Sequence, residues 1–500
     1  MRDRNIFTTH INISQIKEFL SSCKYLKLIL VFVALSIIPL FFIGSAHIII
    51  NDINKEARKI AKDGFKRKYQ IEPTEEQLNA EVEWVFESAY NLAKKKGNKG
   101  LLWVHYVNLI RDLNKYVFYT KLLIALTLFS TLLICFLSFI SYINRLFLLI
   151  SFKIGLFVTI SISSISVLSQ SILLAGVIYY LMSHFMHAIS LKLLFIIVST
   201  GVLASLSLIA NYIRKINGKQ IVTGYPVQKS EQQELWEFVE KIANSVGTKM
   251  PDNVMLGLGD NYYVSQSGIT YLSGELKGKT LFISLSCLYR FTQEELEAII
   301  VHELSHFKGG DTFYTFHFYP TWRKAENVLN VAIKPVRFLL VSFMNLFQLS
   351  EAKFSKKREK IADLNAGKLT SNKTMACALV KLSFFLNFWN MVEKESVSAI
   401  SNNQYIINKD DLFNHIIDNS DVKMEDIKKI LETSTISHPM DSHPSLFERL
   451  YYLGVDLDDI LKELYLSHKD KNATFLIKNI HEIEENLSFA EYKQQIPVDR

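Results

Sequence analysis

Thr292-Gln-Glu-Glu-Leu-Glu-Ala-Ile-Ile-Val-His-Glu-Leu-Ser-His306 is the stretch that decides the fold of the second half of the chain. It begins with a threonine followed three residues later by Glu295, the pattern of a capping box, in which each side chain bonds a backbone amide at a helix start. Leucine and isoleucine then recur at helical spacing. Gly309-Gly310 follows, and glycine readily ends a helix. The pattern predicts one helix of about four turns.

The two histidines of this stretch are the strongest chemical signal in the chain. His302 and His306 are four residues apart, so both project from one helix face. Two imidazoles placed in this way can bind one tetrahedral zinc ion. Glu303 lies one step round the helix, where it can act as a base on the zinc-bound water. The alternative is a pair of histidines that are satisfied on an amphipathic helix and bind nothing.

A catalytic zinc site has three protein ligands and an open position, so a third ligand must come from elsewhere. The segment Ser355-Lys-Lys-Arg-Glu359-Lys-Ile-Ala-Asp363 provides the candidate. Glu359 and Asp363 share a helix face, so Glu359 would bind the metal while Asp363 accepts a hydrogen bond from a ligand imidazole. Taken alone, such a segment is more often a solvated basic helix with i,i+4 ion pairs; together with an upstream HExxH it becomes a strong signal.

Three motifs in this order resemble the membrane zinc metallopeptidases of the HtpX type, which are related to the CAAX prenyl endopeptidases. They are the HExxH at 302–306, the ExxxD at 359–363, and Ser442-His443-Pro444-Ser-Leu-Phe-Glu-Arg449. Gly310-Asp311 after the HExxH also fits, and the resemblance covers roughly residues 216–455. It implies a mainly helical α+β protease domain of the gluzincin (zincin-like) type that holds one zinc ion per chain and hydrolyses peptide bonds.

The resemblance also implies roles for residues in the third motif. His443 would help bind the substrate carbonyl or oxyanion, and Arg449 would support it. Ser437-His438-Pro439 offers a rival histidine, but only His443 has an arginine at the family spacing. Without the resemblance, a His-Pro pair before an amphipathic segment could simply mark a helix start.

Four apolar runs, at 28–50, 119–142, 154–182 and 191–213, are long enough to cross a bilayer as helices, which takes about 20 residues. The first predicts a retained anchor rather than a cleaved signal peptide, because the run continues past the small residues that resemble a cleavage site. The third is rich in serine, which predicts that it packs inside the bundle; a substrate groove there is the alternative. Lysine and arginine near the span ends predict a multi-pass protein of the cell (inner) membrane with its protease domain in the cytoplasm.

The expected organisation follows from these runs. It comprises a cytoplasmic segment at 1–27, a transmembrane helix at 28–50, an extracytoplasmic helical insert at 51–117, three transmembrane helices at 118–215, the peptidase domain at 216–455 and a helical tail at 456–500. Within the domain we expect a helix at 231–246 and strands near 262–264, 269–272 and 280–285. An apolar patch at 338–349 is too short to span and predicts an interfacial or core helix.

Composition limits the other classes of function. The chain has 500 residues, of which 49% are hydrophobic, and a net charge of +7 that we attribute to membrane topology. Neither a nucleic-acid nor a nucleotide signature is present, so the expected partners are a protein or peptide substrate and lipid. The four scattered cysteines predict a reducing compartment. A protease of membrane protein quality control or processing is expected; a catalytically silent zinc-stabilised sensor or scaffold and a transporter are the alternatives.

Overall fold

The computed structural model describes residues 24–95, 101–183, 188–216, 220–259, 261–271, 273–402, 404–420, 427–429, 431, 443–463 and 472–495. The chain divides into two compact units. The described residues of unit 1 fall within Met1–Ile143, Ile150–Arg214 and Lys324–Phe347. Those of unit 2 fall within Asn144–Leu149, Lys215–Arg323 and Gln348–Arg500. The rival motif Ser437-His438-Pro439 lies outside the described residues.

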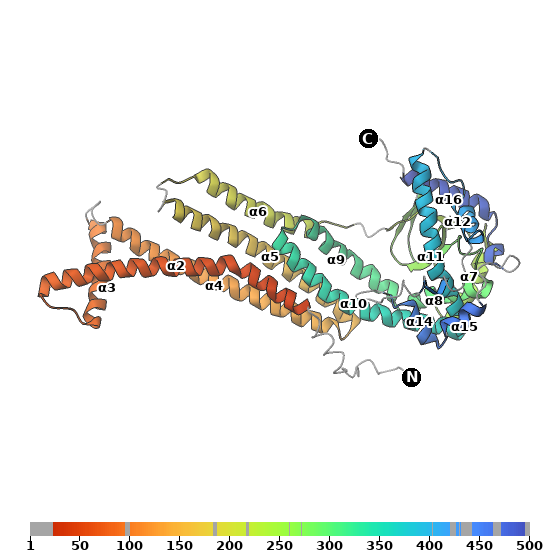
Figure 1. The fold of residues 1–500 in the computed structure, drawn as a ribbon, viewed down its shortest axis with the longest axis horizontal. Helices are drawn as coiled ribbons and strands as arrows, with labels where there is room; N and C mark the ends of the chain where they lie inside the picture. Colours follow the sequence, from red (N-terminus) through yellow and green to blue (C-terminus); the bar gives the residue numbers. More distant parts are fainter. Residues whose placement is uncertain are drawn as a thin grey trace. The chain divides into compact units, whose positions relative to one another are not determined.

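Unit 1 is built from long helices (Figure 1). They are α2 (Lys24–Tyr69), α3 (Glu75–Lys95), α4 (Leu101–Ser141), α5 (Arg145–Leu181, in this unit from Ile150), α6 (Leu191–Ile213), and the parts of α9 (Asp311–Val331) and α10 (Lys334–Leu369) within 324–347. By length and composition, α2, α4, α5 and α6 are each able to cross a membrane. Each of the four predicted apolar runs lies in one of these helices; that they cross a membrane remains a prediction.

The segment at 51–117 is helical, as expected, but it is continuous with the spans. Helix α2 runs on to Tyr69 and α4 already begins at Leu101, while α3 lies between them in the chain and packs on both. An apolar run indicates which part of a helix can lie in lipid. The helix itself continues until its backbone hydrogen-bond pattern ends.

Helix α5 is the most enclosed of these four helices, as its serines predict. Half of its most apolar window is buried, against 17% to 33% for the other three. Ser163 bonds the carbonyl of Thr159 at 2.7 Å, and Ser205 of α6 bonds the carbonyl of Ser164 at 2.9 Å. Small hydroxyl side chains therefore let α5 and α6 approach closely, and several of these hydroxyls bond backbone carbonyls of the two helices.

The apolar patch at 338–349 is part of the long helix α10. Its Phe343 and Phe347 pack around Phe152 of α5, with ring centroids 5.3 Å apart in each pair, and all three residues are buried. The patch therefore belongs to a packed core, which is one of the two placements the sequence predicts.

Unit 2 contains a mixed sheet in the order β2–β3–β7–β4, from β2 (Tyr225–Val227), β3 (Asn253–Gly257), β4 (Tyr263–Ser265) and β7 (Thr280–Ser284). β3 and β7 are parallel, and β2 and β4 pair antiparallel to them at the edges. A smaller sheet has the order β1–β5–β6, from β1 (Gln220–Ile221), β5 (Ile269–Tyr271) and β6 (Gly274–Leu276). The predicted strands near 262–264, 269–272 and 280–285 are confirmed to within a residue or two.

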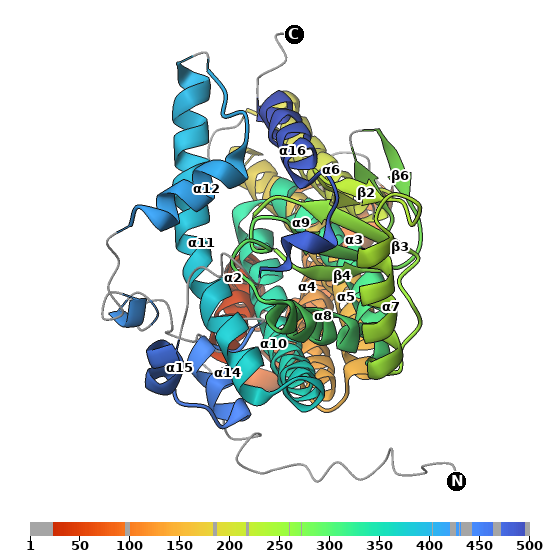
Figure 2. The same cartoon turned by 90° about the vertical axis from the view of Figure 1, so that its right-hand side faces the viewer.

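Helices surround the mixed sheet and bring its apolar residues into one core. They are α7 (Gln233–Val246), α8 (Gln293–Lys308), α11 (Asn372–Ser401), α12 (Lys409–Asp418), α14 (Leu446–Leu453), α15 (Leu457–Glu463) and α16 (Ile480–Gln495), together with a short 3₁₀ helix, η2 (Ala473–Leu476). Figure 2 shows α8 and α11 side by side, and both contribute side chains to this core. The sequence prediction of a helical tail is confirmed by α15 and α16.

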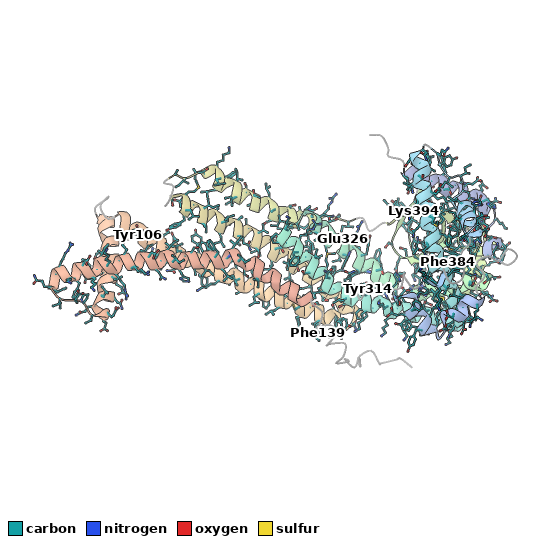
Figure 3. The ribbon with its side chains drawn as sticks, in the orientation of Figure 1. Tyr106, Phe139, Tyr314, Glu326, Phe384 and Lys394 are labelled. Carbon is teal, nitrogen blue, oxygen red and sulfur yellow. The ribbon has the colours of Figure 1, made fainter. Side chains whose placement is uncertain are left out.

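Helix α11 is a fifth helix that is long and apolar enough to span a membrane, and the sequence analysis did not predict it. Its most apolar window is 61% buried within the protein, and Phe384 (labelled in Figure 3) lies fully enclosed in the unit 2 core. The buried Lys381 bonds the carboxylate of Glu295 at 2.8 Å. A helix that is buried on most sides in a protein core is as apolar as one that crosses lipid, which explains the composition of α11.

The motif helix α8 forms as the sequence predicts. Thr292 is its N-cap, and both bonds of the capping box are present, at 2.8 Å and 3.2 Å. Glu295 also receives the ammonium of Lys381, so α11 fixes the start of α8. The helix ends at Gly309, and Gly310 has a positive φ of 69° that allows the chain to turn directly into α9.

Candidate metal centre

Helix α8 presents two imidazoles to one point. Because His302 and His306 are one turn apart, their Nε2 atoms lie 3.3 Å from each other. His302 is buried and His306 is nearly so, with 6% and 13% of their side chains exposed. The Nε2 atoms face each other, and both Nδ1 atoms face carboxylates.

Glu359, from helix α10, completes a cluster with these two imidazoles. Its carboxylate oxygens lie 3.4 Å from Nε2 of His302 and 3.6 Å from Nε2 of His306. A zinc ion with bonds of about 2.0–2.1 Å and tetrahedral angles holds its ligand atoms about 3.3–3.4 Å apart. The three donors therefore fit the N₂O set of a catalytic zinc site in both type and spacing.

Each histidine is held from behind by an aspartate, and each aspartate is held by an arginine. Nδ1 of His302 lies 2.9 Å from Asp363, which is fully buried. Arg449 contacts that aspartate with two nitrogens, at 2.9 Å and 2.6 Å. Nδ1 of His302 thus faces Asp363 at ion-pair distance, and Nε2 is the nitrogen turned toward the other candidate metal donors.

A second, parallel arrangement stands behind His306. Its Nδ1 lies 3.0 Å from Asp311, whose other oxygen accepts a 2.6 Å bond from Arg145. Arg358 adds positive charge at 4.0 Å from that oxygen. Neither Arg145 nor Arg358 is among the predicted site residues, and Arg145 entered the sequence prediction only as a positive charge at the end of a span. The pair Gly310-Asp311 was a fitting feature, but no spacing rule connects it with an arginine 166 residues earlier in the chain.

The electrostatics of the cluster follow from this arrangement. Burial opposes the charge of Asp363, but the bonds from Arg449 and His302 outweigh it and lower the pKa of Asp363. Burial likewise opposes protonation of His302, yet Asp363 and Glu359 raise its pKa to about 10. Glu359 has its pKa lowered by His302 and His443 in spite of burial. Asp363 and Glu359 thus favour the protonated form of His302 in the metal-free protein.

Glu303 lines a cleft of about 480 Å³ together with the three donor residues. Burial is the largest effect on Glu303 and raises its pKa above the ordinary glutamate value, although the neighbouring histidines oppose the rise. A carboxylate whose pKa is raised toward neutrality is suited to exchange a proton with water. The cleft is also lined by Tyr262, Tyr263 and Val264, in and next to the edge strand β4.

His443 and Arg449 lie at different depths in the same cleft. His443 is 69% exposed, and its Nδ1 is 3.5 Å from Glu359. Arg449 comes from α14, whose capping box is formed by Ser445 and Glu448. Arg449 approaches Glu359 only to 3.9 Å and makes its close contacts with Asp363. The structure thus brings all of the sequence-predicted residues together, and it places Arg449 behind a ligand histidine.

Comparison with known proteins matches residues 229–454 to the profile described as Peptidase family M48. The chain is 26% identical over 202 residues to "Protease HtpX homolog" of Bacteroides fragilis, a match that covers 35% of this chain and 60% of that protein. It is 24% identical over 316 residues to "Protease HtpX homolog" of Archaeoglobus fulgidus, covering 58% and 86%. "Protease HtpX" of Shewanella frigidimarina is 28% identical over 200 residues, covering 34% and 64%. These matches confirm the HtpX-type resemblance, and the chain spans about 60% of the length of the Bacteroides fragilis relative.

Proposed function

We propose that this chain, whose residues 229–454 form a domain of peptidase family M48, is a multi-pass membrane protein that hydrolyses internal peptide bonds with one catalytic zinc ion. The observation that carries the proposal is the convergence of His302, His306 and Glu359, whose donor atoms all lie within 4.8 Å of one another. A bound zinc ion would supply a Lewis acid that acidifies water and polarises the scissile carbonyl.

Glu303 is the proposed general base. Its pKa, raised by burial, suits it to take a proton from the attacking water and to return that proton to the leaving amine. His443 reaches into the cleft from its exposed position and is the proposed donor to the carbonyl oxygen, on which negative charge develops. Its partner in the free protein is Glu359, 3.5 Å away, so substrate would compete for the same imidazole.

The substrate is proposed to bind as an extended strand. β4 is the terminal strand in the described order β2–β3–β7–β4, and residues Tyr263–Ser265 line the cleft beside the metal ligands. An edge strand presents unpaired backbone groups, and an extended peptide can bond to them with little dependence on its sequence. This mode would suit unfolded or locally exposed segments of many proteins and agrees with a role in membrane protein quality control or processing.

The topology of the spans is also a proposal. Lysine and arginine residues near the helix ends favour an orientation in which the protease domain faces the cytoplasm. The scattered cysteines agree with a reducing compartment for this domain, since within the described residues Cys135, Cys287 and Cys377 form no disulfide. Labelling of single introduced cysteines in whole cells, in unit 2 and in the 70–74 loop, would test this orientation.

The deciding experiment is cleavage of a denatured protein by the purified chain in detergent, with and without a chelator. Zinc-restored cleavage that disappears in Glu303→Gln supports the proposal. A chain that binds zinc and stays folded, but cleaves no denatured protein under any condition, would support the zinc-stabilised sensor or scaffold instead.

A further inference from the structure

A second cluster of acidic side chains lies in unit 2, with no residue in common with the metal centre. It consists of Asp410 and Asp411 at the start of α12 and His481 and Glu484 on α16; we refer to these four residues as the α12/α16 cluster. Donor atoms of Asp411, His481 and Glu484 lie within 4.8 Å of one another. His481 is 3.4 Å from Glu484 and 4.0 Å from Asp411.

Two of these carboxylates are fully buried, and the described residues donate a hydrogen bond to only one of the two oxygens of each. Asp410 and Glu484 each have 0% of their surface exposed. One oxygen of Asp410 accepts a bond from Ser286, and one of Glu484 accepts a 2.9 Å bond from Asn408. Within the described residues, Oδ2 of Asp410 and Oε1 of Glu484 are buried and accept no hydrogen bond of normal geometry, although the Tyr289 hydroxyl is close enough to Glu484 to lower its pKa. Buried polar atoms nearly always have a partner, which is a protein group, a water molecule or an ion.

The protein provides little positive charge for this pair. Lys409 is adjacent in sequence, but its ammonium is bonded by Glu393 at 3.1 Å and by Glu491 at 2.8 Å. Across the described part of the chain, the cationic group within ion-pair distance of Glu484 is the exposed His481. Burial raises the pKa of both Asp410 and Glu484; the charge of Glu484 adds to the rise at Asp410, whereas Asn408, Tyr289 and His481 oppose the rise at Glu484. Either a shared proton or a bound cation must therefore compensate this buried charge.

We propose that the α12/α16 cluster binds a second divalent metal ion of the zinc type. Carboxylate oxygens and one imidazole are the ligands that zinc accepts outside cysteine sites. Asp411 and His481 are 66% and 65% exposed and give access from solvent, while the buried Glu484 and Asp410 provide the charge. Asp410 is further connected through Ser286 to the amide of Gly259 at 2.9 Å. The ion would therefore connect helices α12 and α16 to the ends of strands β3 and β7, which precede α8 in the chain.

Metal stoichiometry tests the proposal independently of protease activity. The full chain, purified in detergent, is stripped with a chelator, reloaded with Zn²⁺ and desalted, and its metal content is measured by elemental analysis. We expect two zinc ions per chain in the wild type and one in His481→Ala and in Asp411→Asn. His306→Ala, in the catalytic centre, should also retain one, and the double variant of His306 and His481 none.

His415→Ala is the matched control, because His415 is an exposed histidine of α12 that contacts Asn419 and lies outside the cluster. It should retain two zinc ions. Since the replaced side chains of Asp411 and His481 are exposed, their loss should not prevent folding, and circular dichroism checks this. One zinc ion in the wild type, lost completely in His306→Ala, would overturn the proposal and leave a shared proton between Asp410 and Glu484. An unchanged content of two in His481→Ala and Asp411→Asn would equally place the second ion elsewhere.

Discussion

Replacement of Arg449 by methionine would show what this arginine does. Methionine fills similar space but removes the two contacts with Asp363, at 2.9 Å and 2.6 Å. Asp363 is fully buried and stands 2.9 Å behind the imidazole ring of His302. Without Arg449 the carboxylate loses its main positive partner, so its pKa should rise and its hold on the imidazole should weaken.

The size of the effect follows from these contacts. Loss of a group that orients a metal ligand typically lowers metal affinity about 10–100-fold. Removal of one partner from a buried ion pair costs about 3–5 kcal/mol of folding stability, and Arg449, with 17% of its side chain exposed, should fall at the lower end. We therefore expect Arg449→Met to bind zinc at least tenfold more weakly and to unfold at lower denaturant concentration.

Competition between the protein and a chromophoric chelator measures the zinc affinity, and denaturant unfolding of the zinc-free protein measures the stability. Arg449→Lys is the control, because lysine keeps the charge but cannot make two parallel contacts, so its loss should be intermediate. The resemblance instead implies that Arg449 supports His443 at the substrate carbonyl. Wild-type zinc affinity together with a reduced kcat would favour that role and refute one in which Arg449 acts through Asp363.

Four further outcomes follow from the structure. Glu303→Gln should bind zinc normally yet lose cleavage by a factor on the order of 10²–10⁴ in kcat, measured with a denatured substrate. Zinc uptake at pH 7 should release about one proton from His302, whose pKa of about 10 keeps it protonated in the zinc-free protein; apparent affinity should therefore rise with pH up to about 10, and calorimetry in two buffers measures the proton. Arg145→Met should weaken zinc binding about tenfold through the aspartate behind His306, as chelator competition would show. Lys381→Met leaves the capping-box glutamate without its buried partner and should cost about 3 kcal/mol, measured by denaturant unfolding.

The helix that carries the HExxH could be predicted almost to the residue. Its N-cap, its capping box and its glycine end are all local features, and each depends on side chains within a few positions of the backbone they satisfy. Glu359 and Asp363 were predictable as a pair for the same reason, since i,i+4 spacing alone puts them on one face of α10. Sequence spacing does not predict the contact between two helices. Glu359 could therefore be predicted as the third metal ligand only because it follows an HExxH in the chain, as in the family pattern.

The contact of Arg145 and the location of helix α11 could not be predicted from the sequence. Arg145 acts on a residue 166 positions away, and a lone arginine at the start of an apolar run indicates only the edge of a span. In α11, length and hydropathy are the same whether the helix is surrounded by lipid or by the core of a folded domain. Only the tertiary contacts of Lys381 and Phe384 distinguish the two environments.

The candidate metal centre has two similar series of contacts, each of which runs from a histidine through an aspartate to an arginine. Both series need an arginine, for the following reason. A ligand imidazole must keep its Nε2 free, which requires an anionic acceptor at Nδ1. A buried aspartate stays anionic only if a permanent positive charge stabilises it, and arginine, unlike lysine or histidine, does not lose its proton when buried. Arg449 does this for His302 through Asp363, and Arg145 does it for His306. In the proposed zinc site, folding of the domain would already place both histidines, and zinc would replace the proton on His302.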